Sequence, residues 1–480
     1  MIKQLRLENI GPAPLLEVGE FGQRLNLFTG DNGLGKTFLL DACWYALTRT
    51  WPDGKQFYPL PEAPKKPTPT IDYAIIGQNG REAKNTAEYQ YRGQSWMRKQ
   101  ARQSSPGLVI YARIDGGFSV WDPARNYRHD DENEDAYRAR RMMDIRNYRP
   151  DDENENGRER PPAYQFTKDQ VWDGLEEGEG KEKVIICNGL LRDVESWRAR
   201  SNGSFALLGG VLEGLSEREN APLIFGEGVR VRLDDVRDIP TLQMPYGSVP
   251  VTQAAAGMRR VLALAYLLVW AWEEHVRAAG LQKDSPTNRI VVLFDEVEAH
   301  LHPKWQRVFL PSLIKVVDGL LVTGRVEAIK NDPAKILDQK ARAVGKEIPR
   351  SVQIIATTHA PMVLASVETL WRGDKDKLFI LDIKRDDPGT KAGVTLAETP
   401  WARQGDVVGW LVSNAFGMRQ ARSKEAEDAI EAAEKWMRGE FGSLPAALDS
   451  KETIHAELLR VLAGHDPFWP RWIVKAEDRA

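Results

Sequence analysis

The sequence predicts an α/β fold built on a parallel sheet covered by helices, and three observations support this prediction. A strand-like segment from Arg24 to Phe28 leads into a glycine-rich turn and then a helix-like segment. Two further apolar runs, Ile290 to Phe294 and Val352 to Ala356, have the unbroken hydrophobicity of strands buried on both faces. Polar residues follow each of these strands. In parallel sheets, ligands bind beyond the carboxyl ends of the strands, so we expect the functional residues to gather there.

Composition bounds the class of protein. The chain has 480 residues, enough for two or three domains, and its 66 basic and 69 acidic side chains give a net charge of −3. This balance offers no overall electrostatic argument for nucleic acid. Two isolated cysteines, Cys43 and Cys187, form no disulfide framework or zinc spacing, which indicates a reducing compartment. No signal peptide is visible, and the most apolar run, Val261 to Trp272, is too short to span a bilayer. We expect a cytoplasmic location and no membrane association.

Strand, turn and helix signals suggest five regions. Residues 1–60 form a first lobe, with strands at Met1 to Leu7 and Arg24 to Phe28 and a helix from about Thr37 to Thr48. Residues 61–125 form an antiparallel β subdomain of short strands, residues 126–249 an insertion with helical character, and residues 250–397 a second lobe that begins with a long apolar helix. Residues 398–480 form a helical extension with charged amphipathic segments at Ser423 to Arg438 and Lys451 to Ala463.

The stretch from Asn126 to Pro162 is polar and charged. Its segment 126–134 returns 21 residues later as 147–155 in a near copy. Such a stretch buries too little apolar surface to offset its ordering entropy, so we expect a solvated insertion. The basic cluster from Arg138 to Arg141 is an alternative phosphate contact, although charge runs are more often solvated faces.

The turn after the second strand has a recognisable phosphate-binding pattern. Residues 30–37 match G-x-x-x-x-G-K-S/T, the Walker A motif, with the sequence Gly30-Asp31-Asn32-Gly33-Leu34-Gly35-Lys36-Thr37. Glycines allow the tight turn that points backbone N–H groups at a phosphate, and the following helix N-terminus adds partial positive charge. Lys36 is expected to reach the β- and γ-phosphates, and Thr37 to ligate Mg²⁺. The alternative is an ordinary glycine-rich turn.

A second motif lies 259 residues further on. The apolar run from Ile290 to Phe294 ends in Asp295 and Glu296, the Walker B form. Asp295 is expected to hold Mg²⁺, and Glu296 to accept a proton from the water that attacks the γ-phosphate. An Asp-Glu turn after a strand is common by itself, but its pairing with the first motif favours the functional interpretation.

The third element places a histidine after a buried strand. The run from Ile354 to Ala356 leads into Thr357-Thr358-His359-Ala360-Pro361. His359 is one of only seven histidines, and its position suits a contact to the γ-phosphate. A lone histidine after a strand is more often structural, but the order of the three motifs favours a catalytic role.

The three motifs in this order, with a large insertion between the first two, resemble the ABC-type ATPase heads of the SMC, RecF and OLD group (AAA family ATPases). Residues 295–303, Asp-Glu-Val-Glu-Ala-His-Leu-His-Pro, are similar to the DEPE-x-HLHP run of the OLD and RecF branch, and residues 357–361 to its TTHSP segment. The resemblance covers about residues 1–50 and 250–385. It implies an ATPase that binds ATP and Mg²⁺ between the two subunits of a homodimer.

In such heads a signature motif of the second subunit contacts the γ-phosphate. The corresponding segment is Gln253 to Arg260, with Gly257 allowing close backbone approach and Arg259 in a position that is often basic or polar in the family. Ala255 stands where the family has a serine, which removes one expected hydrogen bond to the γ-phosphate and argues against fast hydrolysis. Gln78 is a poor candidate for the family's Q-loop glutamine, because it lies in a hairpin-like turn.

The resemblance extends to prokaryotic anti-phage ATPases of the Septu, retron-associated and PARIS type. It implies a separate effector, an HNH-type nuclease or a toxin, because no nuclease motif is visible in this chain; the tail around Trp469 and Trp472 is a candidate docking surface or, equally, a small core. One alternative is a repair or recombination ATPase of the SMC or RecF type that clamps DNA. Another is a slowly hydrolysing, ATP-locked scaffold.

Overall fold

The computed structural model describes residues 1–59, 67–78, 80–98, 104–126, 163–178, 183–200, 203–216, 223–331, 350–384 and 393–477. The segment between Asn126 and Pro162 that the sequence analysis singled out falls almost entirely outside these residues. The chain divides into two compact units, residues 1–403 and residues 404–480. Among the described helices, none combines the length and apolarity that crossing a membrane requires.

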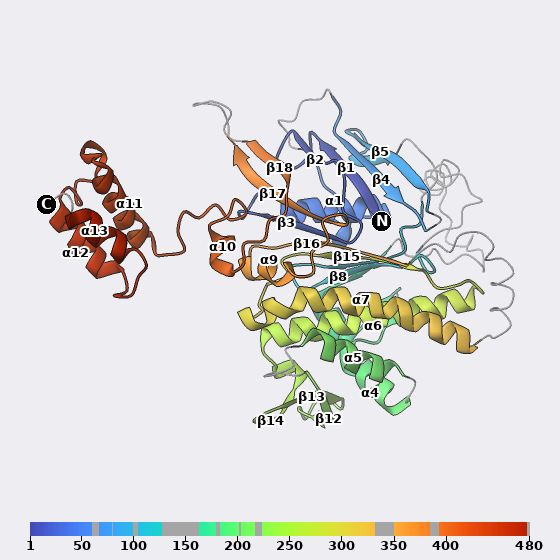
Figure 1. Ribbon diagram of the computed structural model, residues 1–480. Helices are drawn as coiled ribbons and strands as arrows, with labels where there is room; N and C mark the ends of the chain where they lie inside the picture. The colour runs from blue at the N-terminus through green and yellow to red at the C-terminus, as the bar shows by residue number, and fades with distance from the viewer. Residues whose placement is uncertain are drawn as a thin grey trace. The chain divides into compact units, whose positions relative to one another are not determined.

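An eight-stranded sheet forms the centre of the first unit (Figure 1). Five neighbouring strands, β17, β3, β16, β15 and β7, run parallel, and the antiparallel strands β18, β8 and β9 complete the two edges. In spatial order the strands are β18 (Gly393–Thr399), β17 (Asp376–Lys384), β3 (Leu25–Gly30), β16 (Ser351–Thr357), β15 (Arg289–Phe294), β7 (Leu108–Ala112), β8 (Phe118–Trp121) and β9 (Tyr164–Phe166). Strands β15 and β7 are buried throughout, which explains their unbroken hydrophobicity.

A second, antiparallel sheet packs over helix α1 (Lys36–Thr48) on one side of the central sheet (Figure 1). Its strands, in spatial order, are β2 (Leu15–Val18), β1 (Ile2–Glu8), β4 (Thr70–Ile76), β5 (Glu82–Gln90) and β6 (Ser95–Arg98). One hydrophobic cluster joins both sheets and α1, with Leu5, Leu40, Tyr73 and Leu293 among its buried members. The first helix is therefore held between two sheets, and its N-terminus is fixed by the core beneath it.

Two long helices, α6 (Ala256–Leu281) and α7 (Pro303–Asn331), cover the opposite face of the central sheet (Figure 1). Helix α5 (Ser204–Leu215) packs on both, and α9 (Pro361–Val367) packs on α7. Smaller elements complete this unit: α3 (Lys168–Asp173), β10 (Leu175–Glu177), β11 (Val184–Cys187), α4 (Leu190–Arg200), β12 (Phe225–Arg230), β13 (Asp238–Met244) and β14 (Gly247–Pro250).

The second unit is a small helical bundle with its own core. Its helices are α10 (Val407–Leu411), α11 (Lys424–Arg438), α12 (Lys451–Val461) and α13 (Trp469–Glu477). The hydroxyls of Ser423 and Ser450 cap the N-termini of α11 and α12. Trp472 is 1% exposed in this core, and its indole N–H donates to His455 Nδ1 at 3.0 Å. Trp472 therefore belongs to a small core and is not available as a docking surface.

The structure differs from the sequence analysis in the placement of one strand and in the content of residues 163–249. The strand at 108–112 was grouped with the antiparallel subdomain, but β7 lies in the central sheet, parallel to β15. All five residues of β7 are buried, as in a central strand. The short hydrophobic runs next to it in the sequence resemble it and made the antiparallel assignment plausible. The region between 163 and 249 carries two small antiparallel sheets as well as helices.

Candidate nucleotide-binding site

Strand order brings the three predicted motifs to one edge of the central sheet. Strand β16 lies between β3 and β15, so the segments that follow these three strands emerge side by side. Residues 30–37 follow β3, Asp295 and Glu296 follow β15, and His359 follows β16. Sequence distances of more than 250 residues are closed by strand pairing, as expected for ligand sites in parallel sheets.

The loop of residues 30–37 has the backbone of a phosphate cradle. Gly30, Gly33 and Gly35 all have positive φ, at 141°, 79° and 92°. A Cβ at Gly30 would collide with the carbonyl of Leu381, and one at Gly35 would lie 2.7 Å from Pro12 Cγ. Both positions thus require glycine for space as well as conformation. Gly33 faces open space, and Asp31 and Asn32 are exposed.

Lys36 is buried against its own loop. Its Nζ donates to the carbonyls of Gly30 at 2.8 Å and Asp31 at 2.7 Å, and the residue is 6% exposed. Burial lowers the pKa of Lys36, while the nearby carboxylates of Glu296 and Asp295 act in the opposite direction. The Lys36 ammonium therefore lies within the loop, hydrogen-bonded to its carbonyls and near the carboxylates of Glu296 and Asp295. Leu34, the fifth residue of the loop, is buried and anchors it.

The carboxylate of Asp295 links the ends of all three strands. Its Oδ2 accepts a hydrogen bond from Thr37 Oγ1 at 2.7 Å, and its Oδ1 accepts one from Thr357 Oγ1 at 2.7 Å. Asp295 is 1% exposed, whereas Thr37 is exposed. A hydroxyl and a carboxylate that already touch form a hard oxygen donor pair of the kind that Mg²⁺ prefers. The pair predicted to hold the metal is therefore assembled in this structure.

Glu296 and His359 meet beside this pair. His359 Nε2 lies 3.4 Å from Glu296 Oε1, and both side chains are about one quarter exposed, at 27% and 28%. Glu296 adopts φ of 48°, a left-handed conformation that is unusual for a residue with a side chain. Its backbone N–H donates to Thr357 Oγ1 at 2.8 Å, which helps hold that conformation. Backbone outliers held in this way are concentrated at functional sites.

The carboxylate of Glu298 holds the backbone around His359 in place. It accepts hydrogen bonds from Thr358 Oγ1 at 2.8 Å and from the backbone N–H of His359 at 2.5 Å. Thr358 is fully buried. These bonds couple the loop after β15 to the loop after β16, so the position of His359 depends on the Glu298 carboxylate.

In the predicted signature segment, Arg260 contacts the candidate site of its own chain, a role that the sequence did not indicate. Arg260 Nη2 donates to the carbonyls of Asp295 at 2.8 Å and Glu296 at 3.0 Å, and its guanidinium lies 5.3 Å from the Phe294 ring centroid. Burial lowers the pKa of Arg260. Gly257 approaches His300, since a Cβ there would lie 2.5 Å from the His300 carbonyl oxygen. No hydrogen bond or ion pair among the described residues joins Gly257 or Arg259 to residues 30–37.

A further carboxylate, the half-buried Asp41, lies on helix α1 close enough to Asp295 to feel its charge. Asp41, one turn after Thr37 on α1, accepts a hydrogen bond from Tyr111 Oη at 2.8 Å. Burial raises the pKa of Asp41 to about 7, the Asp295 charge adds to the increase, and the Tyr111 hydrogen bond opposes it. The raised pKa makes Asp41 a candidate for titration near neutral pH.

Four residues of this network were missed as functional candidates: Arg260, Glu298, Thr357 and Thr358. They lie within or beside the motifs that the sequence displayed, but their roles depend on contacts between loops of different strands. The third carboxylate of Asp295-Glu296-Val297-Glu298 was the available signal for Glu298. Gln78 donates through its side chain to Ser105 Oγ at 3.0 Å, and no hydrogen bond of the described residues brings it to residues 30–37.

Two protein-family models match the segments of the chain that contain these residues. Residues 244–364 match the family described as an AAA ATPase domain, and residues 4–106 match the family described as an AAA domain. The first match contains the segments around Gly257, Asp295 and His359, and the second contains residues 30–37. The two matches lie on either side of residues 107–243, and each covers less than half of the chain. None of the curated proteins compared with this chain matches it in sequence.

Solved structures with some similarity to this chain include SMC head domains and RecF. An SMC head domain from Thermotoga maritima is 12% identical, with a TM-score of 0.36 over 84% of this chain and 99% of that chain. An Smc head domain with an extended coiled coil, bound to the C-terminal domain of ScpA derived from Pyrococcus furiosus, is 13% identical, with a TM-score of 0.39 over 83% and 96%. The recombination mediator protein RecF is 12% identical, with a TM-score of 0.35 over 79% and 95%. At these TM-scores the overlays assign no residue of this chain, so the roles below rest on its own contacts.

Proposed function

We propose that this chain binds ATP with Mg²⁺ on residues 30–37 and hydrolyses it. The observation that carries the proposal is the shared carboxylate of Asp295, which joins Thr37 to Thr357 while His359 lies 3.4 Å from Glu296. Backbone N–H groups of the loop and the N-terminus of α1 bind the β-phosphate. Lys36 turns from the carbonyls it now contacts to the β- and γ-phosphate oxygens. Thr37 and Asp295 hold Mg²⁺, which when bound offsets the negative charge on these oxygens.

Glu296 is the proposed general base. A water molecule attacks the γ-phosphorus, its proton passes to the Glu296 carboxylate, and ADP leaves with the electron pair of the broken P–O bond. His359 orients Glu296 and donates a hydrogen bond to the γ-phosphate. The left-handed backbone of Glu296 and its bonds to Thr357 and Arg260 hold the carboxylate in one place, which is what a positioned base requires.

The decisive experiment compares ATP turnover and ATP binding in wild type, Glu296→Gln and Lys36→Ala. Glu296→Gln should lower turnover about 100-fold or more, the usual cost of losing a positioned general base, and should still bind ATP. Lys36→Ala should lose ATP binding. If wild type and Glu296→Gln both bind ATP but neither hydrolyses it, the ATP-locked scaffold is favoured instead.

We also propose that the nucleotide is shared with a second copy of the chain. Gly257 and Arg259 have no hydrogen bond to the loop of their own chain among the described residues, which supports assigning them to the nucleotide of a partner subunit. Glu296→Gln with ATP and Mg²⁺ should shift from monomer to dimer in light scattering, and Arg259→Met in that background should reduce the shift. A dimer that forms equally with and without ATP would contradict this arrangement.

The biological role that we propose is control of a separate effector in anti-phage defence. This part rests on the motif resemblance around residues 295–303 and 357–361. Bacteria that carry the chain with its genomic neighbours should resist phage infection, and Glu296→Gln should change that resistance. Protection that needs neither Glu296 nor Lys36 would overturn the role of ATP. ATP turnover stimulated by DNA, with a steep dependence on salt, would support the DNA-clamping alternative.

A further inference from the structure

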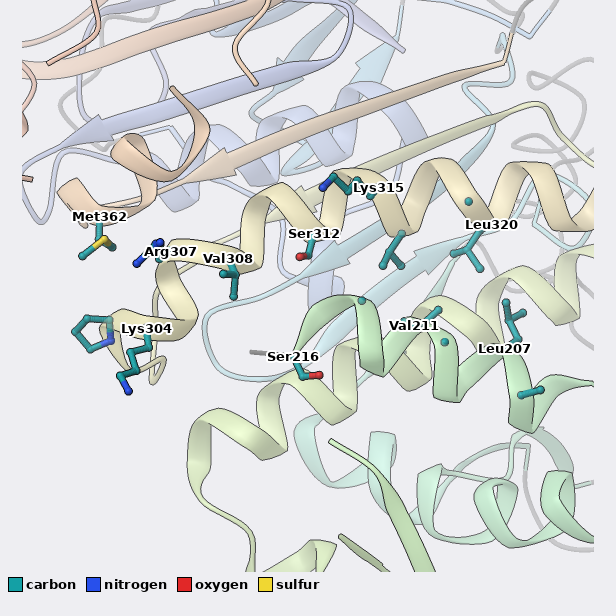
Figure 2. Close-up of a pocket in the computed structure, with 16 residues that line it drawn as sticks. Leu207, Val211, Ser216, Lys304, Arg307, Val308, Ser312, Lys315, Leu320 and Met362 are labelled. Atoms are coloured by element: carbon teal, nitrogen blue, oxygen red, sulfur yellow. The ribbon is translucent and has the colours of Figure 1, made fainter. Parts of the chain in front are cut away.

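An open groove of about 970 Å³ runs between helices α5 and α7 (Figure 2), on the face of the central sheet opposite helix α1 (Figure 1). We call it the α5–α7 groove; residues 206–216 of α5 and the turn after it, residues 303–320 of α7 and Met362 of α9 contribute its lining. In Figure 2, Leu207 and Val211 face the α7 side, where Val308 and Leu320 lie. The floor is therefore apolar and is built from two helices that pack together along part of their length.

Basic side chains line this groove, and no acidic side chain of the described residues lines it. The basic ones are Lys304, Arg307 and Lys315. All three are exposed, and within the described part of the chain none of them forms an ion pair with a carboxylate. The exposed acids on the same helices, Glu213 and Asp318, are not among the lining residues. A chain of net charge −3 thus presents a locally positive, apolar groove.

The shape of the groove suits a helix. Helix α5 has 12 residues, which corresponds to about 18 Å at the α-helical rise. At Gly210, an exposed position in that helix, an added Cβ would meet nothing within 4 Å. Glycine in a helix interior costs stability relative to alanine, about 1 kcal/mol. Its presence on the groove side leaves room for the backbone of another element to come close.

The groove is also adjacent to the loops that carry the proposed chemistry. Helix α7 starts at Pro303, directly after the segment of residues 295–302, and α9 starts at Pro361, two residues after His359. Lys304 and Arg307 lie at the end of the groove near Met362 (Figure 2). An occupant at this end would contact the elements that continue from Glu296 and His359.

We propose that the α5–α7 groove is a docking surface for an acidic amphipathic helix of a protein partner. The apolar face of that helix packs on the half-buried Leu207 and Val308, as amphipathic helices do in hydrophobic grooves. Its carboxylates pair with Lys304, Arg307 and Lys315, and opposite charge selects the partner and orients it. A nucleic acid is a poorer fit, because the floor is apolar and presents no exposed aromatic rings on which bases stack. The proposal concerns docking alone and goes beyond the hydrolysis proposed above.

The test uses a fluorescently labelled synthetic helix of 18 residues (about 27 Å) with leucines on one face and glutamates beside them. A second peptide has lysine in place of every glutamate. The full chain should bind the acidic peptide, and Arg307→Glu and Gly210→Leu should each weaken binding at least tenfold. Leucine is a better helix former than glycine, so Gly210→Leu fills the groove without disfavouring α5. Lys84→Glu is the matched charge-reversal control. Lys84 lies outside the groove, its side chain is 77% exposed, and its ion pair to Glu82 is long, at 4.0 Å. This variant should bind the acidic peptide as tightly as wild type.

Binding is measured without nucleotide and repeated in Lys36→Ala, so the result does not depend on the proposed ATP site. Equal affinity in Lys36→Ala with weak binding in Arg307→Glu and Gly210→Leu supports the groove. The proposal is overturned if the acidic peptide does not bind, if the lysine peptide binds as tightly, or if Gly210→Leu binds like wild type. It is also overturned if single-stranded DNA binds more tightly than the acidic peptide and shows the same sensitivity to both variants.

Discussion

The imidazole Nε2 of His359 lies 3.4 Å from the carboxylate Oε1 of Glu296, although the two residues follow different strands and are 63 positions apart. Parallel pairing of β15 and β16 brings their carboxyl ends together. The exact separation is then set by the residues around the pair. Thr357 fixes the backbone of Glu296, and Glu298 fixes the backbone of His359. Substitutions at Glu298 and Arg260 alter the contacts around this pair.

Glu298→Gln should lower kcat for ATP about 10- to 100-fold and leave KM for ATP nearly unchanged. The glutamine amide keeps one acceptor oxygen but presents N–H donors to a site that needs two acceptors, so Thr358 or the His359 N–H loses its partner. A catalytic side chain displaced by about 1 Å can cost 100-fold. Steady-state kinetics beside Asp318→Asn, an exposed acid of α7, checks this. Turnover at the wild-type rate in Glu298→Gln, with loss of turnover in His359→Ala, would show that Glu298 does not position the histidine.

Arg260→Met should lower the melting temperature, whereas Arg259→Met should leave it within error of wild type. Arg260 donates to the carbonyls of Asp295 and Glu296, and a buried hydrogen bond from a charged group contributes about 1.5–3 kcal/mol. Arg259 makes no such bond to this strand among the described residues. Thermal unfolding of both variants tests the difference, and equal melting temperatures would contradict it. If Arg259 contacts the nucleotide of a partner subunit, Arg259→Met should lose turnover while its stability is unchanged.

Gly257→Ala should destabilise the protein by about 1–3 kcal/mol, the range for forcing an extra group into a packed contact. A Cβ at Gly257 would lie 2.5 Å from the His300 carbonyl oxygen, so one backbone segment must move. Gly280→Ala in the same helix is the matched control, because a Cβ there meets nothing within 4 Å, and it should be neutral or stabilising by up to about 1 kcal/mol. Chemical denaturation of the two variants provides the measurement. Equal effects would show that the approach of Gly257 to His300 is not a packing constraint.

Asp41→Asn should increase stability relative to wild type more at pH 7.5 than at pH 5. The pKa of Asp41 is raised to about 7 in the folded state from 3.8, so between these values the folded chain binds more protons than the unfolded chain. Ionisation of Asp41 therefore lowers the free energy of unfolding progressively as pH rises from about 4 to 7. Below about pH 4 both states are protonated, and Asp41 has no such effect. Asparagine removes the titration. Melting temperatures of both proteins at the two pH values, without Mg²⁺, check the prediction, and a pH-independent difference would contradict it.

Much of the site was predictable from local sequence because each motif is short and chemically constrained. Residues 30–37 need glycine at positions with positive φ, and the structure places Gly30, Gly33 and Gly35 in such conformations. The runs 290–294 and 352–356 read as buried strands because both their faces are covered. The mixed α/β fold, with its parallel central strands, follows from these runs.

Tertiary structure decided what these motifs contact. Strand 108–112 has the same local pattern whether it pairs with an antiparallel neighbour or with β15, and only the assembled sheet selects β15. Arg260 and Glu298 resemble surface charges in sequence, but their partners come from loops 35 and 61 residues away. The burial of Trp472 in the second unit likewise depends on packing between helices. Sequence determines which residues are able to do the chemistry, because that depends on side-chain type and local backbone. Long-range pairing and burial determine which of them are held in place, because those contacts exist only after the chain has folded.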